Sequence, residues 1–450
     1  MAPGAERKPS DSSPAVAYAT DLTHRYPTFR DESFKTTHNW LEGRRYDDGA
    51  EGLWRIQDAL YDLEDFARTH PGGSEWIRRT KGTDITEAFE THHITRTAEQ
   101  MLPKFYVRPA TQPRNIRLTF AEHGFFRTLK RRVRQKLETV DPTPTKHSCQ
   151  ILDVLLLTVL LTAYLAVYFD SYAIGFVCGA FVNATIIAAH NFLHQRDNWR
   201  MLAFNIAFLS YREWRVSHVM SHHLYPNSLL DMEISGFEPF LCYLPWPELK
   251  NSFQRYGSWF YGPFIFGAVF LSEYIKRLMD SVNQGKNRFY LDDLIPFLLP
   301  TFMYITNPGS LGVVLRLWLF IVLMGSLWFG LVGLSAGHHH PKALHSGDVF
   351  PDGIDFGLYQ LATIVERRGV TGSLLKVLTT FGDHHLHHMF PTLDHAIFPQ
   401  LNDVFLQTCR EFHVGQLSSS WFSQFLAQNI QLARVKPRVH RCTVEPKTSK

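Results

Sequence analysis

The 450-residue chain lacks the features that mark several common classes of protein. Its five cysteines (Cys149, Cys178, Cys242, Cys409 and Cys442) form no CxxC pair and no regular framework, which excludes a disulfide-stapled or zinc-ribbon fold. The net charge is only +4, so no basic excess points to nucleic acid. Roughly the first thirty residues contain no apolar segment of the kind that a secretory signal peptide needs. No glycine-rich dinucleotide fingerprint follows a strand, so a nicotinamide site would have to lie on another protein.

Aromatic residues and long apolar runs, by contrast, are abundant. Aromatics make up 14% of the chain, with 35 Phe. Ile151–Phe169 and Tyr172–Ala189 are each long enough to cross a bilayer, and the polar break between them joins the two runs into a hairpin. Arg and Lys precede the first run and follow the second, while the connecting loop has none. This distribution predicts that both ends of the hairpin are cytosolic.

Three clusters of histidine stand close to apolar segments. They are His190/His194, His218/His222/His223 and His384/His387/His388. Spacings of three and four residues place side chains on one face of a helix, and imidazole binds Fe, Zn, Cu and Ni alike. For any single residue, a polar histidine at a membrane interface is the simpler interpretation, but repeated spacings argue against it. We expect one shared polynuclear metal site, with Asp383 as the nearest acid able to orient a ligand and His385 outside the spacing.

Three further apolar segments lie between the second and third histidine clusters: Trp259–Phe270, Leu294–Ile305 and Leu315–Ala336. The clusters can share a site only if an even number of membrane crossings separates them. We therefore expect Leu294–Ile305 and Leu315–Ala336 to cross the bilayer, and Trp259–Phe270 to lie in the cytosolic interface. A full crossing by Trp259–Phe270 is the alternative, and it would split the site.

The composition divides the chain into five segments. They are a flexible tail (1–36), a soluble mixed domain (37–110), a linker (111–148), an apolar membrane domain (149–415) and a cytosolic C-terminal tail (416–450). The linker contains a basic amphipathic helix, Phe125–Leu137. Its position just ahead of an apolar run favours a helix on the membrane surface over a solvated helix with one core-facing side.

The soluble domain contains the run His70-Pro71-Gly72-Gly73 and, after an acidic helix, His93. Together with the acidic Tyr61–Phe66 stretch and Gly82–Glu90, this pattern resembles the cytochrome b5 haem-binding domain along nearly its whole length. The resemblance implies that His70 and His93 bind haem b from opposite faces, with His92 as the alternative to His93. Two axial histidines leave no open position on the iron, so such a haem transfers electrons and binds no substrate.

The histidine clusters, including the HxxxHH form of the middle one, resemble those of the membrane fatty-acid desaturase family. The resemblance implies a pair of non-haem iron ions at the cytosolic end of four transmembrane helices. In that family a further histidine follows the last span. The run Ser335-Ala336-Gly337-His338 matches its context, which adds His338 to the ligands and leaves His339 and His340 open. Where the family often has an Asn that contacts a metal ligand without binding the metal itself, this chain has Gly333-Leu334. The role of that Asn is therefore unfilled here or taken by a residue elsewhere in the chain.

The order of the two domains resembles that of front-end and sphingolipid desaturases. The expected fold is an α+β haem domain followed by an all-α, four-span domain. The expected function is O2-dependent insertion of a double bond into a fatty-acyl chain in the lipid bilayer, reduced by a separate NADH-dependent cytochrome b5 reductase, at the endoplasmic reticulum with both termini cytosolic. Lipid hydroxylation and a catalytically silent haem carrier are the alternatives. His384 stands where front-end enzymes usually have Gln, so their position-selectivity does not carry over.

Overall fold

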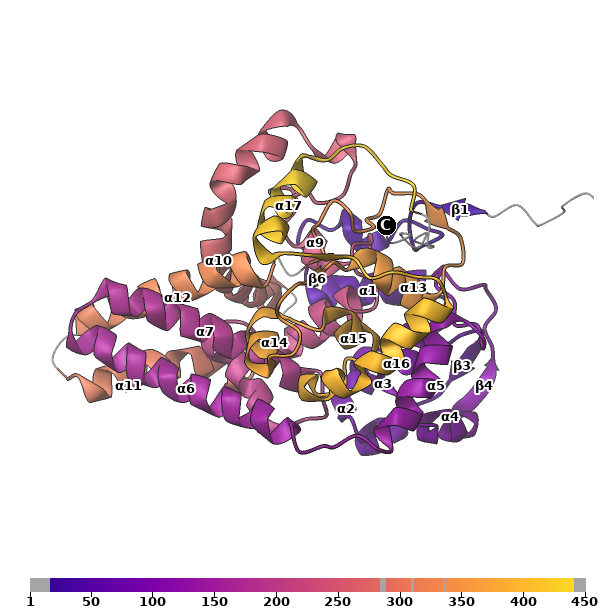
Figure 1. Cartoon of the computed structure of the whole chain (residues 1–450), viewed down its shortest axis with the longest axis horizontal. Helices are drawn as coiled ribbons and strands as arrows, with labels where there is room; N and C mark the ends of the chain where they lie inside the picture. The colour runs from indigo at the N-terminus through magenta and orange to yellow at the C-terminus, as the bar shows by residue number, and fades with distance from the viewer. Residues whose placement is uncertain (1–16, 284–288, 309–310, 335–336, 441–450) are drawn as a thin grey trace, which may run out of the picture.

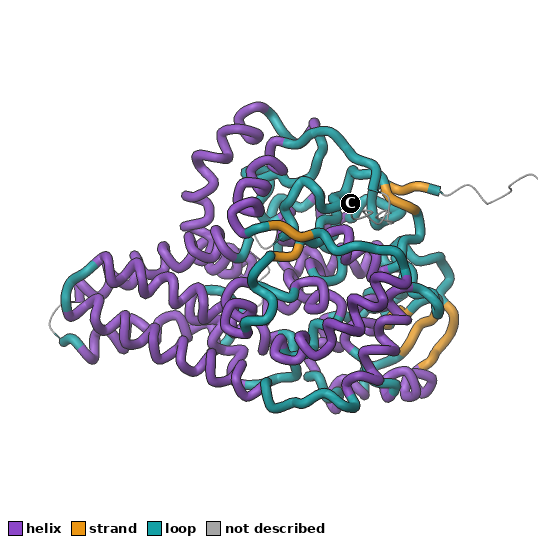
Figure 2. The backbone as a smooth tube through the Cα atoms, viewed as in Figure 1, coloured by secondary structure: helices purple, strands orange, loops and turns teal. Residues whose placement is uncertain are grey.

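The computed structural model describes residues 17–283, 289–308, 311–334 and 337–440. Figure 1 shows a bundle of long helices that extends to one side of a larger part, in which short helices and loops cover one another. Figure 2 shows that strands are few and lie in the larger part. The chain therefore has the predicted order, an N-terminal unit with a sheet followed by a helical domain.

The N-terminal unit is built on a three-stranded antiparallel sheet with the order β2-β3-β4. Its elements are α1 (Thr37–Asp47), β2 (Trp54–Ile56), β3 (Ala59–Tyr61), α2 (Ser74–Arg79), α3 (Thr86–His92), α4 (Thr97–Met101) and β4 (Tyr106–Pro109). A small core of its own, which includes Trp54, Ile56, Leu63 and Ile77, holds the sheet and the helices together. His70 follows a 3-10 turn (Phe66–Thr69) and His93 follows α3, so each histidine stands at the end of a short helical segment of this unit.

Three helices of the described chain are long and apolar enough to cross a membrane. They are α6 (Thr145–Tyr168), α7 (Tyr172–Leu193) and α12 (Leu311–Val332), and they match the first, second and last predicted spans. The remaining predicted span, Leu294–Ile305, is divided between a 3-10 turn (Leu291–Phe297) and the short helix α11 (Leu298–Thr306). The helix α10 (Ser258–Asn283), which contains the predicted interfacial segment, crosses the direction of the bundle in Figure 1.

The remaining helices and two short sheets cap the bundle at the end where α7 finishes. The helices are α5 (Phe125–Leu137), α8 (Tyr211–Trp214), α9 (Met232–Ser235), α13 (Phe356–Thr363), α14 (Leu374–Thr380), α15 (His384–Met389), α16 (Phe398–Glu411) and α17 (Trp421–Ala433). The strands β1 (Tyr18–Ala19) and β5 (Phe350–Pro351) pair antiparallel, and β6 (Glu366–Arg367) and β7 (Ser418–Ser419) pair parallel. Four of the cysteines are free thiols here, and Cys442 lies outside the described residues.

Two sequence predictions are wrong: the flexible tail, as far as residues 17–36 are described, and the membrane-surface position of helix Phe125–Leu137. From residue 17 onward the expected flexible tail is folded, because β1 joins a sheet and Leu22 and Phe29 are buried. The basic helix α5 does not present its apolar face to lipid, because Phe126 and Val133 are fully buried in a core shared with α13 and α16. Its basic face is paired instead with acidic residues of the protein, as in the Lys130–Glu90 ion pair at 3.1 Å.

Close approach of α7 and α12 depends on glycine. A Cβ atom at Gly179 would lie 2.8 Å from the backbone nitrogen of Gly325 and 2.8 Å from Cβ of Met324. Since backbone cannot yield as a side chain can, Gly179→Leu should force these helices apart and cost about 1–3 kcal/mol. Thermal unfolding of the detergent-solubilised protein measures this loss. Gly312→Leu is the matched control because a Cβ atom at Gly312 would meet no described atom within 4 Å, and an equal loss in both variants would contradict the packing argument.

Candidate functional site

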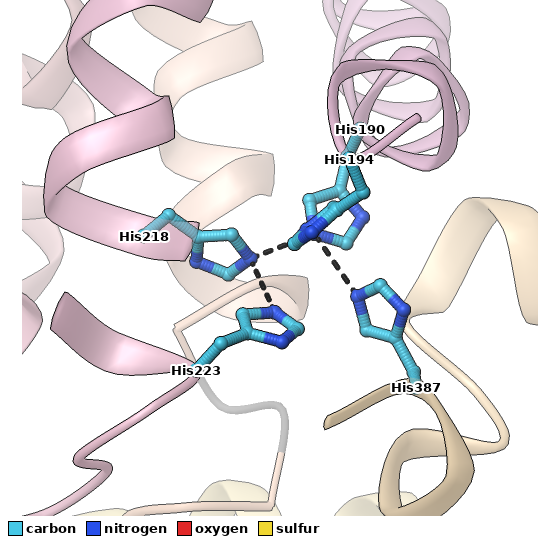
Figure 3. A group of neighbouring side chains, drawn as sticks. All are labelled: His190, His194, His218, His223 and His387. Carbon is cyan, nitrogen blue, oxygen red and sulfur yellow. Dashed lines mark hydrogen bonds between the residues drawn. The ribbon is translucent and has the colours of Figure 1, made fainter. Parts of the chain in front are cut away.

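The nine predicted histidines of the membrane domain come together in two buried groups at the capped end of the bundle. The first group is His190, His194, His218, His223 and His387, and the second is His222, His338, His384 and His388. Within each group the facing ring nitrogens all lie within 4.8 Å of one another. Figure 3 shows the first group, with rings that converge from three separate segments on one point. The site is therefore shared by clusters that lie far apart in the sequence.

The first cluster is placed by the end of α7. His190 lies in its last turn and His194 caps it, so the four-residue spacing puts both side chains on the same face. Their Nε2 atoms are 2.8 Å apart. Asn191, between them, accepts hydrogen bonds from the backbone N–H of His395 and from its ring Nδ1, which fixes His395 with its ring centre 4.4 Å from that of His387.

The second cluster is carried by a π-helical segment, Arg215–His222, and not by an α-helix. The backbone N–H of His223 donates to the carbonyl of His218 at 2.8 Å, a five-residue step that brings these two rings together. Their Nε2 atoms are 3.0 Å apart in the first group, while His222 turns to the second group. The π-turn is the physical reason why this cluster contributes to both groups rather than to one face.

The third cluster is placed by α15 and also divides. His384 and His388, four residues apart, share the face that enters the second group, and His387 points to the first. His338, which follows α12, completes the second group, with its Nε2 2.7 Å from that of His384. The two residues that precede Gly337 in the predicted motif, Ser335 and Ala336, lie outside the described residues.

The chemistry of these donor sets fits metal cations. A neutral imidazole carries a single N–H, so rings whose nitrogens converge on one point cannot all hydrogen-bond to one another. Burial, and then the neighbouring imidazoles, hold the pKa of His223, His384 and His388 well below the ordinary value, which favours the neutral form that binds metals. Soft thiolates are absent from both groups, so the sets are of the all-imidazole kind that suits iron, zinc, copper or nickel.

Outer partners fix the orientation of several of these rings. Nδ1 of His218 faces a Glu233 carboxylate oxygen at 2.5 Å, and Nδ1 of His222 faces Asp231 at 3.0 Å. Burial opposes protonation of His222, but Glu233 and Asp231 outweigh it and raise its pKa to about 9. The side-chain oxygen of Gln360 accepts from Nδ1 of His388 at 3.1 Å. Such partners make imidazole a stronger ligand and set its tautomer.

Sequence reasoning missed all of these outer residues. The acidic pair in Asp231-Met232-Glu233, soon after the middle cluster, is a signal that could have been found, whereas Gln360 carries no local signal. The prediction for Asp383 is also wrong in position. The acid that holds the third cluster is Glu366, which accepts from the backbone N–H of His384 at 3.0 Å and from Nδ1 of His385 at 3.1 Å. His385 is thereby directed away from both groups.

The residues around His338 show why it alone of three successive histidines enters a group. His339 stacks on Tyr243 with ring centres 3.7 Å apart, and Nδ1 of His340 accepts from the backbone N–H of Lys342, so neither enters a group. The Asn227 amide donates to the carbonyl of His338 at 3.1 Å and to two further carbonyls. An asparagine therefore supports this ligand from another segment, although Gly333-Leu334 occupies the position where the family motif has one.

The N-terminal unit has its own histidine pair. The rings of His70 and His93 have centres 6.2 Å apart. Two imidazole–metal bonds of about 2 Å each, plus the ring radii, span about that distance. Nδ1 of His70 donates to the Gly73 carbonyl and Nδ1 of His93 to the Phe89 carbonyl, each at 3.0 Å, so both Nε2 atoms are free to bind. Burial lowers the pKa of His93 to about 4, which keeps its ring neutral.

Comparison with known proteins identifies a family for each of the two parts of the chain. The fatty acid desaturase family profile matches residues 169–420, and the cytochrome b5-like haem/steroid binding domain profile matches residues 38–110. The chain is 43% identical to the cytochrome b5-related protein of Drosophila melanogaster, covering 92% of this chain and 96% of that protein. It is 23% identical to the acyl-lipid (8-3)-desaturase of Mortierella alpina, covering 89% and 97%. No solved structure matches the chain.

Proposed function

Because this chain belongs to the fatty acid desaturase family and carries a cytochrome b5-like domain ahead of it, we propose that it is a membrane-bound, O2-dependent lipid desaturase with a built-in electron donor. The observation that carries the proposal is the convergence of nine histidines into a group of five and a group of four. In this proposal each group holds one non-haem iron ion. The pair of ions, when bound, supplies the activation of O2 that removes hydrogen from an acyl chain.

The residues around the second group suit an acyl substrate. A small cavity of about 20 Å³, with room for about one water molecule, lies against it; besides Glu233 and the histidines, its walls are apolar. They include Trp214, Phe329, Gly333, Leu334 and Phe381. Such walls would exclude water from a reacting carbon, and they would have to move apart to admit a methylene chain. Several relatives are named as acyl-lipid desaturases, which supports the same class of substrate for this chain.

The haem proposed between His70 and His93 has a role set by its ligands. With His70 and His93 both bound to its iron, such a haem would pass single electrons and would have no open position for O2 or lipid. We assign its reduction to a separate NADH-dependent cytochrome b5 reductase, in keeping with the absence of a dinucleotide fingerprint from this sequence. The covalent link between the two domains keeps the donor at a high effective concentration next to its acceptor.

The proposed topology has four spans with the metal site and both termini on the cytosolic side, as in an endoplasmic reticulum enzyme. The lengths of α6, α7 and α12 support three crossings. The 3-10 turn and α11 together supply the fourth, since α11 packs against α6 and α12 inside the bundle. The direction of α10, across the bundle in Figure 1, supports its placement in the interface.

Iron analysis combined with lipid profiling tests this proposal. The purified protein should contain one haem and two non-haem irons per chain, and cells that express it should gain an unsaturated acyl product. Haem without non-haem iron would overturn the proposal in favour of a haem electron carrier with a silent membrane domain. A hydroxylated lipid in place of the unsaturated one would assign the site to hydroxylation instead. Cells that express the chain with His388→Ala provide the matched background.

A further inference from the structure

The N-terminal unit is docked against the membrane domain through a specific interface. Trp40 donates its ring N–H to the Leu230 carbonyl at 2.9 Å, and the Tyr225 hydroxyl donates to Glu87 at 2.9 Å. All four of these residues are buried. At the rim, Glu75 of α2 pairs with Arg212 at 3.0 Å. Buried polar contacts of this kind have one satisfied geometry, so they hold the two parts in a single relative position.

This docking brings the haem-ligand turn next to the first histidine cluster. A Cβ atom on Gly73 would lie 2.8 Å from a carboxylate oxygen of Asp197, three residues after His194. Arg215 binds the same Asp197 at 2.6 Å and donates to the carbonyl of Leu193 at 3.1 Å. Arg215 is itself only 3% exposed. The loop that follows His194 is therefore fixed from one side by the membrane domain and touched from the other by the haem-binding turn.

His92 occupies the space between the two sites. It is the covalent neighbour of His93, and it contacts Trp76, whose ring centre is 5.7 Å away. The Arg215 guanidinium lies over the same Trp76 ring at 4.7 Å. Through Arg215 the contact continues to Leu193, the covalent neighbour of His194.

Packing alone does not explain a histidine at this position. Nδ1 of His92 bonds to the Ala88 carbonyl at 3.0 Å, but its Nε2 is buried without a hydrogen-bond partner among the described residues. A buried polar atom that lacks a partner costs stability, and an apolar ring of similar size would avoid that cost. A role that depends on the aromatic imidazole ring accounts for a histidine at position 92, between the two cofactor sites.

We propose that His92 and Trp76 form the internal link through which electrons pass from the haem to the histidine-bound metal site. The proposal rests on the proposed function. Each transfer oxidises the haem by one electron and reduces the metal site by one electron. Two transfers and two protons, with O2 and two hydrogens of the acyl chain, balance to one double bond and two molecules of water. The path needs no motion of the docked domains, because its contacts are already in place.

The rate at which pre-reduced haem is reoxidised tests the link. The protein is placed in vesicles made from the lipids of cells in which it forms product. It is reduced with a limiting amount of dithionite and then mixed with O2. Stopped-flow absorbance follows the ferrous haem band. The His388→Ala variant, whose metal site is incomplete, gives the baseline of direct haem oxidation. We expect His92→Leu and Trp76→Leu to be several-fold slower than wild type and close to that baseline. Trp76→Phe, which keeps an aromatic ring, should restore most of the rate.

The variants must differ from wild type only in the rate of electron transfer from the haem to the metal site. The haem absorption spectrum, the haem midpoint potential and the bound iron of His92→Leu should equal those of wild type. Wild-type reoxidation in His92→Leu, with normal product, would overturn the link and leave the proposed function standing. A wild-type protein that reoxidises no faster than His388→Ala and forms no product would overturn both. A changed midpoint potential in His92→Leu would overturn the link as well, since His92 would then act on the haem itself.

Discussion

Replacing His388 by alanine should abolish product formation and remove one of the two non-haem irons while leaving the haem in place. His388 belongs to the group of four histidines, so its loss leaves three imidazoles at that point. The ring is held there by a hydrogen bond from Nδ1 to Gln360, with Nε2 buried and unpaired among the described residues. Since loss of an outer partner of a ligand alone costs about 10–100-fold in metal affinity or activity, loss of the ligand should exceed about 100-fold.

Variants of neighbouring residues separate this effect from general damage. His387→Ala removes one member of the group of five and leaves four imidazoles, so it should retain more iron than His388→Ala. Gln360→Leu keeps both ligands and loses only the hydrogen bond, so its activity should fall by about 10–100-fold. His147→Ala, at an exposed position, should behave as wild type.

Iron analysis, haem absorbance and lipid profiling of these variants check the order. Loss of haem from His388→Ala would show that the two sites are not separate. Equal iron in His387→Ala and His388→Ala would contradict the division into a larger and a smaller group. Full activity in Gln360→Leu would mean that the orientation of His388 is set by its backbone alone.

The sequence predicts the long elements of this fold because their signals are local. The apolar runs that become α6, α7 and α12 are defined by length and composition alone. The role of α5 is not local: a basic amphipathic helix has the same sequence pattern on a membrane as against α13 and α16. Only the tertiary fold decides which surface covers Phe126. The same holds for residues 17–36, whose order comes from pairing with β5, more than 300 residues later in the chain.

The nine histidines of the site were predictable as a set, and their partition was not. Spacing identifies them, but an α-helical interpretation places His222 on the face of His218 and turns His223 away from it. The π-turn at Arg215–His222 changes the angle between successive side chains and brings His223 onto the face of His218. Glu366 and Gln360 reach the third cluster from segments with no motif of their own. Their roles therefore depend on tertiary structure.

Replacing His93 by alanine should abolish haem binding, whereas replacing His92 by alanine should preserve it. His93 faces His70, with ring centres 6.2 Å apart, and the hydrogen bonds from Nδ1 of each ring to a backbone carbonyl leave both Nε2 atoms for the iron. His92 contacts Trp76 instead. The Soret band of the purified protein measures the outcome, and a haem-free His92→Ala would reverse the assignment.

The iron of the membrane domain should be unaffected in His93→Ala, because both of its histidine groups lie in other segments. The N-terminal unit should unfold at a lower temperature, since a bound cofactor stabilises the folded state in proportion to its affinity and concentration. Thermal unfolding followed at the haem-domain tryptophans measures this change. His70→Ala should give the same pair of results, and retention of haem by either variant would contradict the two-histidine site.

Loss of product in His93→Ala should be reversible by an external donor. The proposed haem serves as a tethered source of electrons, and a tether raises the effective donor concentration to about the millimolar range. Soluble cytochrome b5 with its reductase, added at much lower concentration and at a temperature that unfolds the docked haem-free unit, should therefore restore part of the activity to His93→Ala but none to His388→Ala. The two variants fail at different steps, since the first lacks a donor and the second lacks a complete acceptor. Restoration of both, or of neither, would contradict the division of labour between the two domains.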